Sequence, residues 1–352
     1  MNANPGANSN AAPAVDASLA TDAASRFNWR DALRPHVRNL GLAAALLIAL
    51  GILGFLRPQY LSCDNLIVVA MQMSFVGIAA IGTAYLVISG GIDLSIGSLF
   101  ALVGVTSAML ARTIGPVPAM MAGVALGGAV GWINGVLTWR IKLSPLIITL
   151  GSMSIIRGAV LLLTGGYSVR SVPKEFATLG QLRPLGVPSP IWLLLLLAVV
   201  AHLVLSRTTI GRYTLALGGN RAACEAVGIR VRRVTLGVFL ANGLIVGIAG
   251  VLAASRFGSA SPAFGEGMEL DVITAVILGG VAFTGGEGNI PGVMLAVALL
   301  GVINSGIVAL GINPEYAEVV KGAALIGAVA IDQFSHEARE RFRKKLAMRE
   351  RT

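Results

Sequence analysis

Long apolar runs, separated by short polar or glycine-rich breaks, fill most of the chain. Most runs approach the roughly 20 residues that an α-helix needs to cross a bilayer, so the pattern predicts an all-α, polytopic integral membrane protein of about ten transmembrane helices. The breaks hold charges and turn-forming residues, which mark where one helix stops and the next begins. The predicted spans are 39–56, 65–89, 95–111, 116–138, 145–164, 190–206, 234–255, 270–284, 290–310 and 316–332.

The two ends of the chain differ from this apolar middle. Residues 1–38 start as a small, polar stretch with too little apolar surface to order itself, and they end in a basic cluster, so they are predicted to form a disordered N-terminal tail. Residues 333–352 form a second basic tail. Between them, residues 39–332 form one transmembrane domain, whose longest inner loop is 206–234. A composition of 55% apolar and 12% charged residues excludes a large soluble domain.

Positive charge predicts the orientation of the chain. When the N-terminus is placed in the cytoplasm, the outer segments hold only a few of the 27 Lys and Arg residues. These are Arg57, Arg112, Arg170, Lys174, Arg183 and Arg256. An excess of basic residues on the cytoplasmic side is the usual bias, so both termini are predicted to be cytoplasmic. The same bias accounts for the net charge of +10, and no nucleic-acid partner is inferred. This topology places Cys63 outside and Cys224 inside.

The stretch LVISGGIDLSIGSLF, residues 86–100, interrupts an apolar run with glycines, serines and one carboxylate. Gly90 and Gly91 would release the second span, and Asp93 and Ser95 would cap the amides that begin the third. On this interpretation the stretch is a hinge, either on the inner side or in a shallow re-entrant bend. The alternative makes Asp93 an ion site in a secondary transporter, whose broken helices bind solutes near the midplane.

Charges within spans normally face a bundle interior, a cavity or the interface. Arg157 falls in the fifth predicted span and Lys321 in the tenth, and we expect Glu269 and Asp271 near the same height toward the outer side. In one interpretation these residues form an outer vestibule that receives substrate. In the other, Arg157 pairs with an acid and Lys321 extends its ammonium to the interface.

Uncharged polar residues also fall within predicted spans, among them Gln72, Asn134, Asn242 and Asn304. Such amides either contact a hydroxyl-rich solute or form hydrogen bonds between helices. Aromatic residues within the spans are few, and the sequence alone identifies no platform on which a sugar would stack.

The inner loop contains a short helix signal. Asn220 is a favourable N-cap, RAACEAV is a good helix former, and Gly228 is a helix stop. An exposed helix of this kind suits a partner protein, although an ordinary basic inner loop explains the same charges. The chain lacks the G-x-x-x-x-G-K-[ST] nucleotide motif and any recognisable nucleophile motif, so it is not predicted to be an enzyme. Its three His and two Cys residues show no metal-ligand spacing.

Four segments occur in a characteristic order: LVISGGIDLSIGS, SPLIITLGSMSIIRGAVLLLTGG, GRYTLALGGNRAACEAVGIRV and ELDVITAVILGGVAFTGGEGNIPG. Together they resemble the signature segments of the ribose-type permease subunits of bacterial ABC importers, a family that includes permeases for ribose, xylose, other monosaccharides and autoinducer-2. The resemblance covers residues 40–332. It implies ATP-driven import of a small polyhydroxylated solute, in the first place a monosaccharide, across the bacterial inner membrane.

The resemblance also implies partners. These are a second permease chain, identical or similar, a periplasmic substrate-binding protein, and a cytoplasmic ATP-binding cassette protein that holds the ATP and Mg, so that this chain carries no cofactor. The coupling helix to the ATPase would comprise Gly218, Gly219, Asn220, Arg221, Ala222, Ala223, Glu225 and Gly228. Within it, Arg221 stands where the wider importer pattern E-A-A-x-x-x-G has an acid, and the spacing to Gly228 is one residue longer, as is common in ribose-type members.

Overall fold

The computed structural model describes residues 29–141, 143–170, 172–330 and 333, so the tails 1–28 and 334–352 lie outside the described residues. Within the described ranges the protein is helical, and its one extended feature is an isolated bridge between Val169 and Ala260. The predicted all-α, polytopic fold is confirmed.

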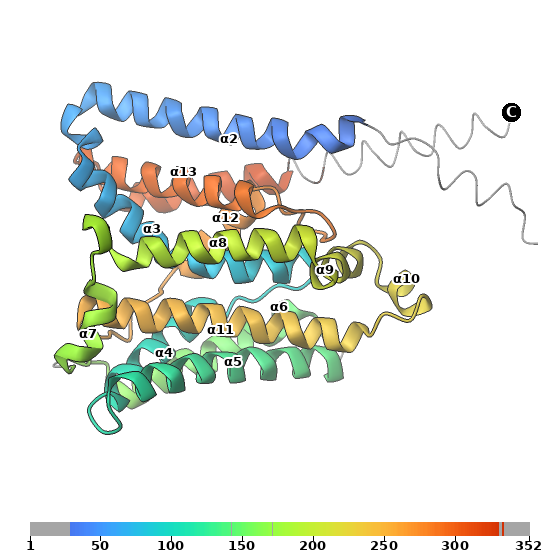
Figure 1. Cartoon of the computed structure of the whole chain (residues 1–352), viewed down its shortest axis with the longest axis horizontal. Coiled ribbons are helices and arrows are strands. Elements are labelled where there is room, and N and C mark those ends of the chain that lie inside the picture. Colours follow the sequence, from blue (N-terminus) through green and yellow to red (C-terminus); the bar gives the residue numbers. More distant parts are fainter. Residues whose placement is uncertain (1–28, 142, 171, 331–332, 334–352) are drawn as a thin grey trace, which may run out of the picture.

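The chain runs through long helices joined by short connections (Figure 1). In order, the elements are α2 (Trp29–Leu56), η1 (Pro58–Leu61), α3 (Cys63–Ile88), α4 (Ile96–Leu110), α5 (Pro116–Ile141), α6 (Pro145–Thr164), α7 (Lys174–Gln181), η2 (Pro184–Gly186), α8 (Ser189–Arg207), α9 (Thr209–Gly219), α10 (Arg221–Ala226), α11 (Val231–Phe257), α12 (Met268–Leu278) and α13 (Ile290–Ala309). Residues 315–330 are also helical.

Seven of the described helices are long and apolar enough to cross a membrane: α2 from Val37 onward, α3, α5, α6, α8, α11 and α13. By contrast, α4 and α12 have only 15 and 11 residues. At the α-helical rise they are about 22 and 17 Å long, short of a hydrocarbon core of about 30 Å. The predicted span 95–111 has the bounds of α4 to within one residue, although that helix is too short to cross the membrane by itself, whereas the predicted span 270–284 is wrong at its end, since α12 stops at Leu278. The reason is that the glycine-rich loop after α12 is almost as apolar as the helix, so hydropathy does not mark the helix end.

The first helix is longer than predicted. It begins at Trp29, whereas the sequence placed the start of the first span at 39 and assigned the preceding residues to a disordered tail. Only the part from Val37 has membrane-spanning hydropathy. Because the apolar pattern reports burial in lipid and not helicity, it misses the polar turns that extend this helix beyond the membrane.

The centre of the bundle is α11, which packs against α3, α4, α5 and α7. Its contact with α5 depends on glycine. A Cβ atom on Gly127 or Gly131 of α5 would collide with the backbone of α11 at Gly243 or Phe239, and a Cβ atom on Gly243 would collide with Gly127. Small residues at these positions let the two backbones approach closely, which is how membrane helices commonly pack.

The bundle has two distinct ends (Figure 1). We refer to the end that carries α9 and α10 as the α10 end, and to the opposite end, which carries η1 and α7, as the α7 end. The two cysteines are free: Cys63 is exposed at the start of α3, toward the α7 end, and Cys224 is buried within α10. Their separation agrees with the sequence prediction that they lie on opposite sides.

Candidate functional site

Asp93 lies in the connection between α3 and α4 and is fully buried. Its Oδ1 atom accepts hydrogen bonds from the Ser95 backbone N–H at 2.8 Å and the Ser95 hydroxyl at 2.6 Å. Its Oδ2 atom accepts from Nδ2 of Asn242 at 3.2 Å. Asn242 belongs to α11 and lies 11 residues, about 16 Å, from the start of that helix. The carboxylate is therefore inside the bundle and not at its surface, which agrees with a re-entrant bend.

Neighbouring helices complete this buried network. Asn134 of α5 donates to the Ser95 hydroxyl at 3.0 Å, and Thr83 of α3 donates to Oδ1 of Asn242 at 3.4 Å. The backbone N–H of Leu94 donates to the hydroxyl of Thr149 on α6 at 3.1 Å. Asn134 and Asn242 thus bond between helices, as one of the two sequence interpretations expects.

The capping prediction is partly wrong. Ser95 is the N-cap residue of α4, but its side chain makes no capping bond. Its hydroxyl instead donates to Asp93 and accepts from Asn134. Of the two side chains, only that of Asp93 accepts a hydrogen bond from a backbone amide at the start of α4, the amide of Ser95. The hydroxyl turns away from the α4 amides because a bond to a carboxylate is stronger than a bond between neutral groups.

The short helix α10 forms as the sequence predicts. Oδ1 of Asn220 accepts from the backbone N–H of Ala223 at 2.9 Å, and Gly228 ends the turn with a positive φ of 79°. Arg221 forms an ion pair with Glu225 at 3.3 Å and lies over the ring of Trp139, 4.9 Å from its centroid. Both charged side chains remain more than half exposed.

One buried side chain anchors α10 to the bundle, in addition to the contact of Arg221 with Trp139. Cys224 is buried against Leu217 of α9 and Val231 of α11, while the remaining α10 residues are exposed. Val227, which follows the helix, is 75% exposed. The helix therefore projects from the α10 end with its polar and apolar surface uncovered in this chain (Figure 1).

Immediately before α10, three glycine-containing segments meet through their backbones. We call this contact the glycine junction; it comprises Gly90, Gly218, Gly219, Gly285 and Gly286. The N–H of Gly286 donates to the carbonyl oxygen of Ile88 at 2.8 Å. A Cβ atom on Gly218 would collide with both of these groups, and one on Gly285 would lie 3.0 Å from the nitrogen of Gly90. The junction thus joins α9, the end of α3 and the loop that follows α12.

Arg157 of α6 binds backbone carbonyls and not an acid. Its Nη1 atom donates to Pro262 at 2.5 Å and to Phe264 at 3.2 Å. Both carbonyls belong to the 258–267 connection between α11 and α12. Arg157 lies seven residues, about 10 Å, from the α7 end of its helix, so this connection dips into the bundle. Of the two sequence interpretations, the one that pairs Arg157 with an acid is not supported, because its Nη1 atom donates to loop carbonyls instead.

Four phenylalanine rings brace the same loop. Phe75 of α3 contacts Phe100 of α4 with ring centroids 6.4 Å apart, and Phe100 contacts Phe264 of the loop at 6.3 Å. Phe257 contacts both Phe264 and Phe75, with ring centroids 5.6 Å and 6.1 Å apart. Together with Arg157, these rings hold the 258–267 segment at the α7 end.

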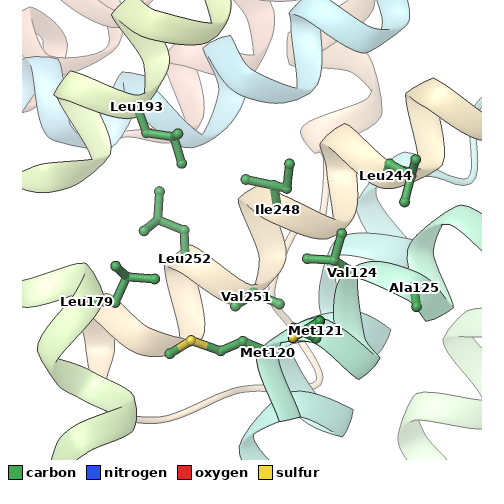
Figure 2. A pocket seen from close by; sticks show the side chains of 10 residues that line it. All are labelled: Met120, Met121, Val124, Ala125, Leu179, Leu193, Leu244, Ile248, Val251 and Leu252. Carbon is green, nitrogen blue, oxygen red and sulfur yellow. The ribbon is translucent and has the colours of Figure 1, made fainter. Parts of the chain in front are cut away.

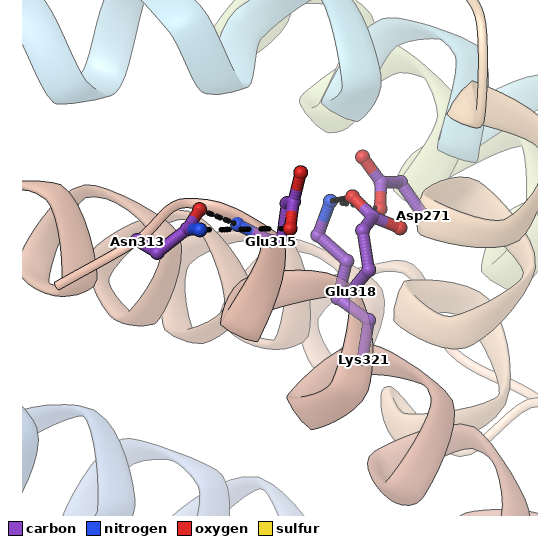
Figure 3. A network of polar contacts seen from close by, with 5 residues as sticks. All are labelled: Asp271, Asn313, Glu315, Glu318 and Lys321. Atoms are coloured by element: carbon purple, nitrogen blue, oxygen red, sulfur yellow. Dashed lines mark hydrogen bonds and ion pairs between the residues drawn. The ribbon is translucent and has the colours of Figure 1, made fainter.

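Lys321 lies in a network of ionic contacts (Figure 3). Its Nζ atom is 2.8 Å from Asp271 of α12 and 2.9 Å from Glu318. The Lys321 side chain is only 13% exposed, so its ammonium is bonded within the bundle and does not extend to the interface. The two ionic contacts of Lys321 therefore contradict the interpretation in which its ammonium extends to the membrane interface. Glu269, the third residue predicted for a vestibule, forms no ion pair with Lys321, and its carboxylate lies against the position where Gly97 lacks a side chain.

Two cavities differ in chemistry. One, of about 430 Å³, is lined by apolar side chains of α5, α7, α8 and α11 (Figure 2). It has no side-chain hydrogen-bonding group for a hydroxyl-rich solute. The other, of about 70 Å³, is lined partly by Gln72, Asp271, Asn304 and Lys321. Within the described ranges, no three His, Cys, Asp or Glu side chains come together as a metal site.

The predicted site residues therefore fall into three groups: the hinge residues, the residues of α10 and the segment before it, and the charged residues. The hinge residues around Asp93 lie inside the bundle. The glycine junction links their neighbour Gly90 to the segment before α10. The charged residues lie toward the α7 end. Sequence reasoning missed Trp139 beneath Arg221 and the loop glycines Gly285 and Gly286; the glycine pair in TGGEG was the one available signal for the latter.

Comparisons of the chain with known proteins match it to transport permeases. The family described as "Branched-chain amino acid transport system / permease component" matches residues 65–329. The ribose import permease protein RbsC of Escherichia coli (strain K12) is 37% identical over 293 residues, which cover 82% of this chain and 91% of that protein. The L-arabinose ABC transporter permease protein AraH of Azospirillum brasilense is 33% identical over 328 residues, covering 93% and 95%.

A third relative is the D-allose transport system permease protein AlsC of Escherichia coli (strain K12), which is 36% identical over 291 residues, covering 82% of this chain and 89% of that protein. No solved structure matches the chain. The chain belongs to this family of transport permeases, as a multi-pass protein of the inner membrane. The matches support the permease prediction over an ion-driven secondary transporter.

Proposed function

We propose that this chain is the membrane-spanning permease subunit of a bacterial ABC importer for a monosaccharide. The observation that carries the proposal is that relatives at 33–37% identity, aligned over at least four fifths of this chain, are named as ribose, arabinose and allose permeases. ATP would be bound and hydrolysed by a separate cytoplasmic subunit, and a periplasmic binding protein would deliver the sugar at the α7 end.

The exposed helix α10 is the proposed docking segment for the ATPase. It projects from the bundle, is fixed to it by the buried Cys224, and lies next to the glycine junction. A movement of α10 would pass through Gly218 to Gly90 and so to the connection that holds Asp93. ATP binding in the partner would then bias the permease between outward-open and inward-open states.

At the α7 end, Asp271, Lys321 and Glu269 are proposed to line the vestibule that receives the sugar. Arg157 positions the 258–267 loop beneath it, through the carbonyls of Pro262 and Phe264. Non-helical backbone at membrane depth is tolerated where it is buried in protein or lines a water-filled cavity. Ala263 and Glu266 of this loop are exposed, which supports a water-filled vestibule.

Reconstitution tests the importer itself. The chain is combined in proteoliposomes with the ATP-binding and periplasmic binding proteins encoded beside it, and uptake of labelled D-ribose, L-arabinose and D-allose is measured. We expect uptake of at least one sugar that requires ATP, is blocked by vanadate and is unaffected by an uncoupler. Uptake abolished by the uncoupler but not by vanadate would favour the ion-driven alternative.

Charge reversal tests the docking segment. Arg221→Glu removes the ion pair with Glu225 and the contact with Trp139, both on an exposed surface where such pairs contribute about 0–1 kcal/mol to stability. We expect a folded, membrane-inserted protein that no longer co-purifies with the ATPase. Arg212→Glu, an exposed reversal on α9, is the control. Equal loss of binding in both variants would contradict a specific role for α10.

A further inference from the structure

Of the amides Gln72, Asn134, Asn242 and Asn304, two differ from the other two in burial and bonding. Asn134 and Asn242 are fully buried and bonded between helices. Gln72 and Asn304 are exposed, and neither has a hydrogen bond to any residue that the structure describes. Sequence alone does not separate these pairs.

Both exposed amides lie at membrane depth. Gln72 is nine residues, about 14 Å, into α3, and Asn304 is five residues, about 8 Å, from the end of α13. Each helix meets the length and hydropathy of a membrane span. Polar side chains at such depth face the bundle interior, a partner or a water-filled cavity and not lipid. The surface formed by α3 and α13 is therefore not a lipid-facing surface.

The small cavity of about 70 Å³ joins these amides to the ionic network. Gln72, Asn304, Asp271 and Lys321 supply its polar lining, and the rest of the lining is apolar. Each amide both donates and accepts, the carboxylate accepts and the ammonium donates. This set matches neighbouring sugar hydroxyls, which both donate and accept. Because two carboxylates already neutralise Lys321, the lining does not favour an anionic solute.

The cavity is too small to enclose a ligand. Pockets for small molecules usually have volumes of about 300–1,000 Å³, so this chain supplies only one wall. Resting on the proposed function, we propose that Gln72, Asn304, Asp271 and Lys321 bind the sugar during translocation, and that a second permease chain facing α3 and α13 supplies the opposite wall. The pathway then runs between the two chains along this surface.

Thiol labelling tests whether this surface borders water. In the assembled transporter carrying Cys63→Ser, Gln72→Cys is treated with a positively charged, membrane-impermeant methanethiosulfonate, and Cys63→Ser alone gives the background from Cys224. Ile155→Cys is the matched control, because Ile155 is 74% exposed on α6 and lies about 14 Å from the α7 end of that helix. We expect labelling of Gln72→Cys at least tenfold faster. Equal rates would overturn the proposal.

Transport tests the role in binding. Gln72→Met and Asn304→Leu preserve side-chain size but remove the amide groups that would bind the sugar, and Ser154→Ala removes an exposed hydroxyl on α6 as a control. We expect at least a tenfold lower uptake rate for the first two variants at subsaturating sugar, with ATPase stimulation by the binding protein retained. If the wild-type transporter moves sugar and both variants match it, this inference fails. If the wild type moves none of the three sugars, the monosaccharide proposal fails, whereas the labelling result still decides whether the surface borders water.

Discussion

Asp93 is a carboxylate enclosed by the bundle and bound only by neutral groups. Its two oxygens use three donors: the Ser95 amide, the Ser95 hydroxyl and the Asn242 side chain. Buried charges are normally paired or well hydrogen-bonded, because desolvation is costly. Here the hydrogen bonds tie the start of α4 to α11, so the side chain fixes the position where the broken helix resumes.

The substitution Asp93→Asn tests this role. The new Oδ1 atom can keep both bonds from Ser95, but the new amide nitrogen would face the amide nitrogen of Asn242. A buried donor without an acceptor costs about 1–3 kcal/mol, so we expect the thermal unfolding midpoint of the purified protein to fall by several degrees, with the fold retained. Adding Asn242→Asp to the same chain restores an acceptor opposite the introduced amide and should recover most of the loss.

Measuring both stability and uptake of Asp93→Asn also distinguishes a structural role of Asp93 from a role of its charge in transport. If Asp93→Asn unfolds at the wild-type temperature but abolishes uptake, the charge itself serves transport and the hinge interpretation is wrong. The sequence predicted that Asp93 binds an amide, since that bond is local. It did not reveal the bonds from Asn242 and Asn134, because they join residues far apart in the chain.

At the scale of elements, α9 and the loop after α12 are linked to the end of α3 by the glycine junction. The contact is made by backbone atoms, and a Cβ atom on Gly218, Gly285 or Gly286 would lie 3.0 Å or less from the backbone of a neighbouring segment. Gly90, Gly285 and Gly286 also have φ values of 80° to 83°, which L-residues with a side chain rarely adopt.

Adjacent glycines allow a matched test of this link. A Cβ atom on Gly218 would collide with the Ile88 carbonyl oxygen, whereas one on Gly219 meets nothing within 4 Å. We expect Gly218→Ala to lower uptake at least tenfold while ATP hydrolysis by the partner continues, because the α3 end is forced away from α9. Gly219→Ala should transport at the wild-type rate. Similar uptake in the two variants would show that the junction does not transmit movement.

The same elements show how far sequence reasoning reaches. The caps of α10 were predicted correctly, since Asn220 and Gly228 act on amides a few residues away. The extent of α4 was also predicted closely, as 95–111, whereas the end of α12 at Leu278 was not, because the glycine-rich segment after it is nearly as apolar as a helix. The junction was not predicted either: each of its three segments carries a glycine pair, but nothing in the sequence indicates that positions near 90, 218 and 286 lie together.

At the scale of the whole molecule, the number of basic residues at each end of the bundle predicts which side of the membrane that end faces. The α10 end carries the basic loop 206–234, and the α7 end carries Cys63 and few cations. If both termini are cytoplasmic, the α7 end faces the periplasm. This orientation places the docking helix next to the cytoplasmic ATPase and the proposed sugar-binding surface toward the binding protein.

Native cysteines suffice to test the orientation. An impermeant maleimide added to intact spheroplasts should label Cys63, which is exposed, and should leave Cys224, which is 3% exposed, unlabelled. Cys63→Ser should abolish the signal. Labelling that appears only after the spheroplasts are lysed would place the α7 end in the cytoplasm and reverse the proposed topology.

Because the glycine junction has no side chains, the transmission of movement and the choice of ATPase depend on different residues. Contacts between backbones are nearly indifferent to sequence elsewhere, so the junction can transmit movement from any helix that occupies the position of α10. The choice of ATPase would instead depend on the exposed residues Arg221, Glu225 and Val227. Exchanging only those side chains for the ones of another permease would then redirect this chain to a foreign ATPase, with the mechanical connection to its hinge left unchanged.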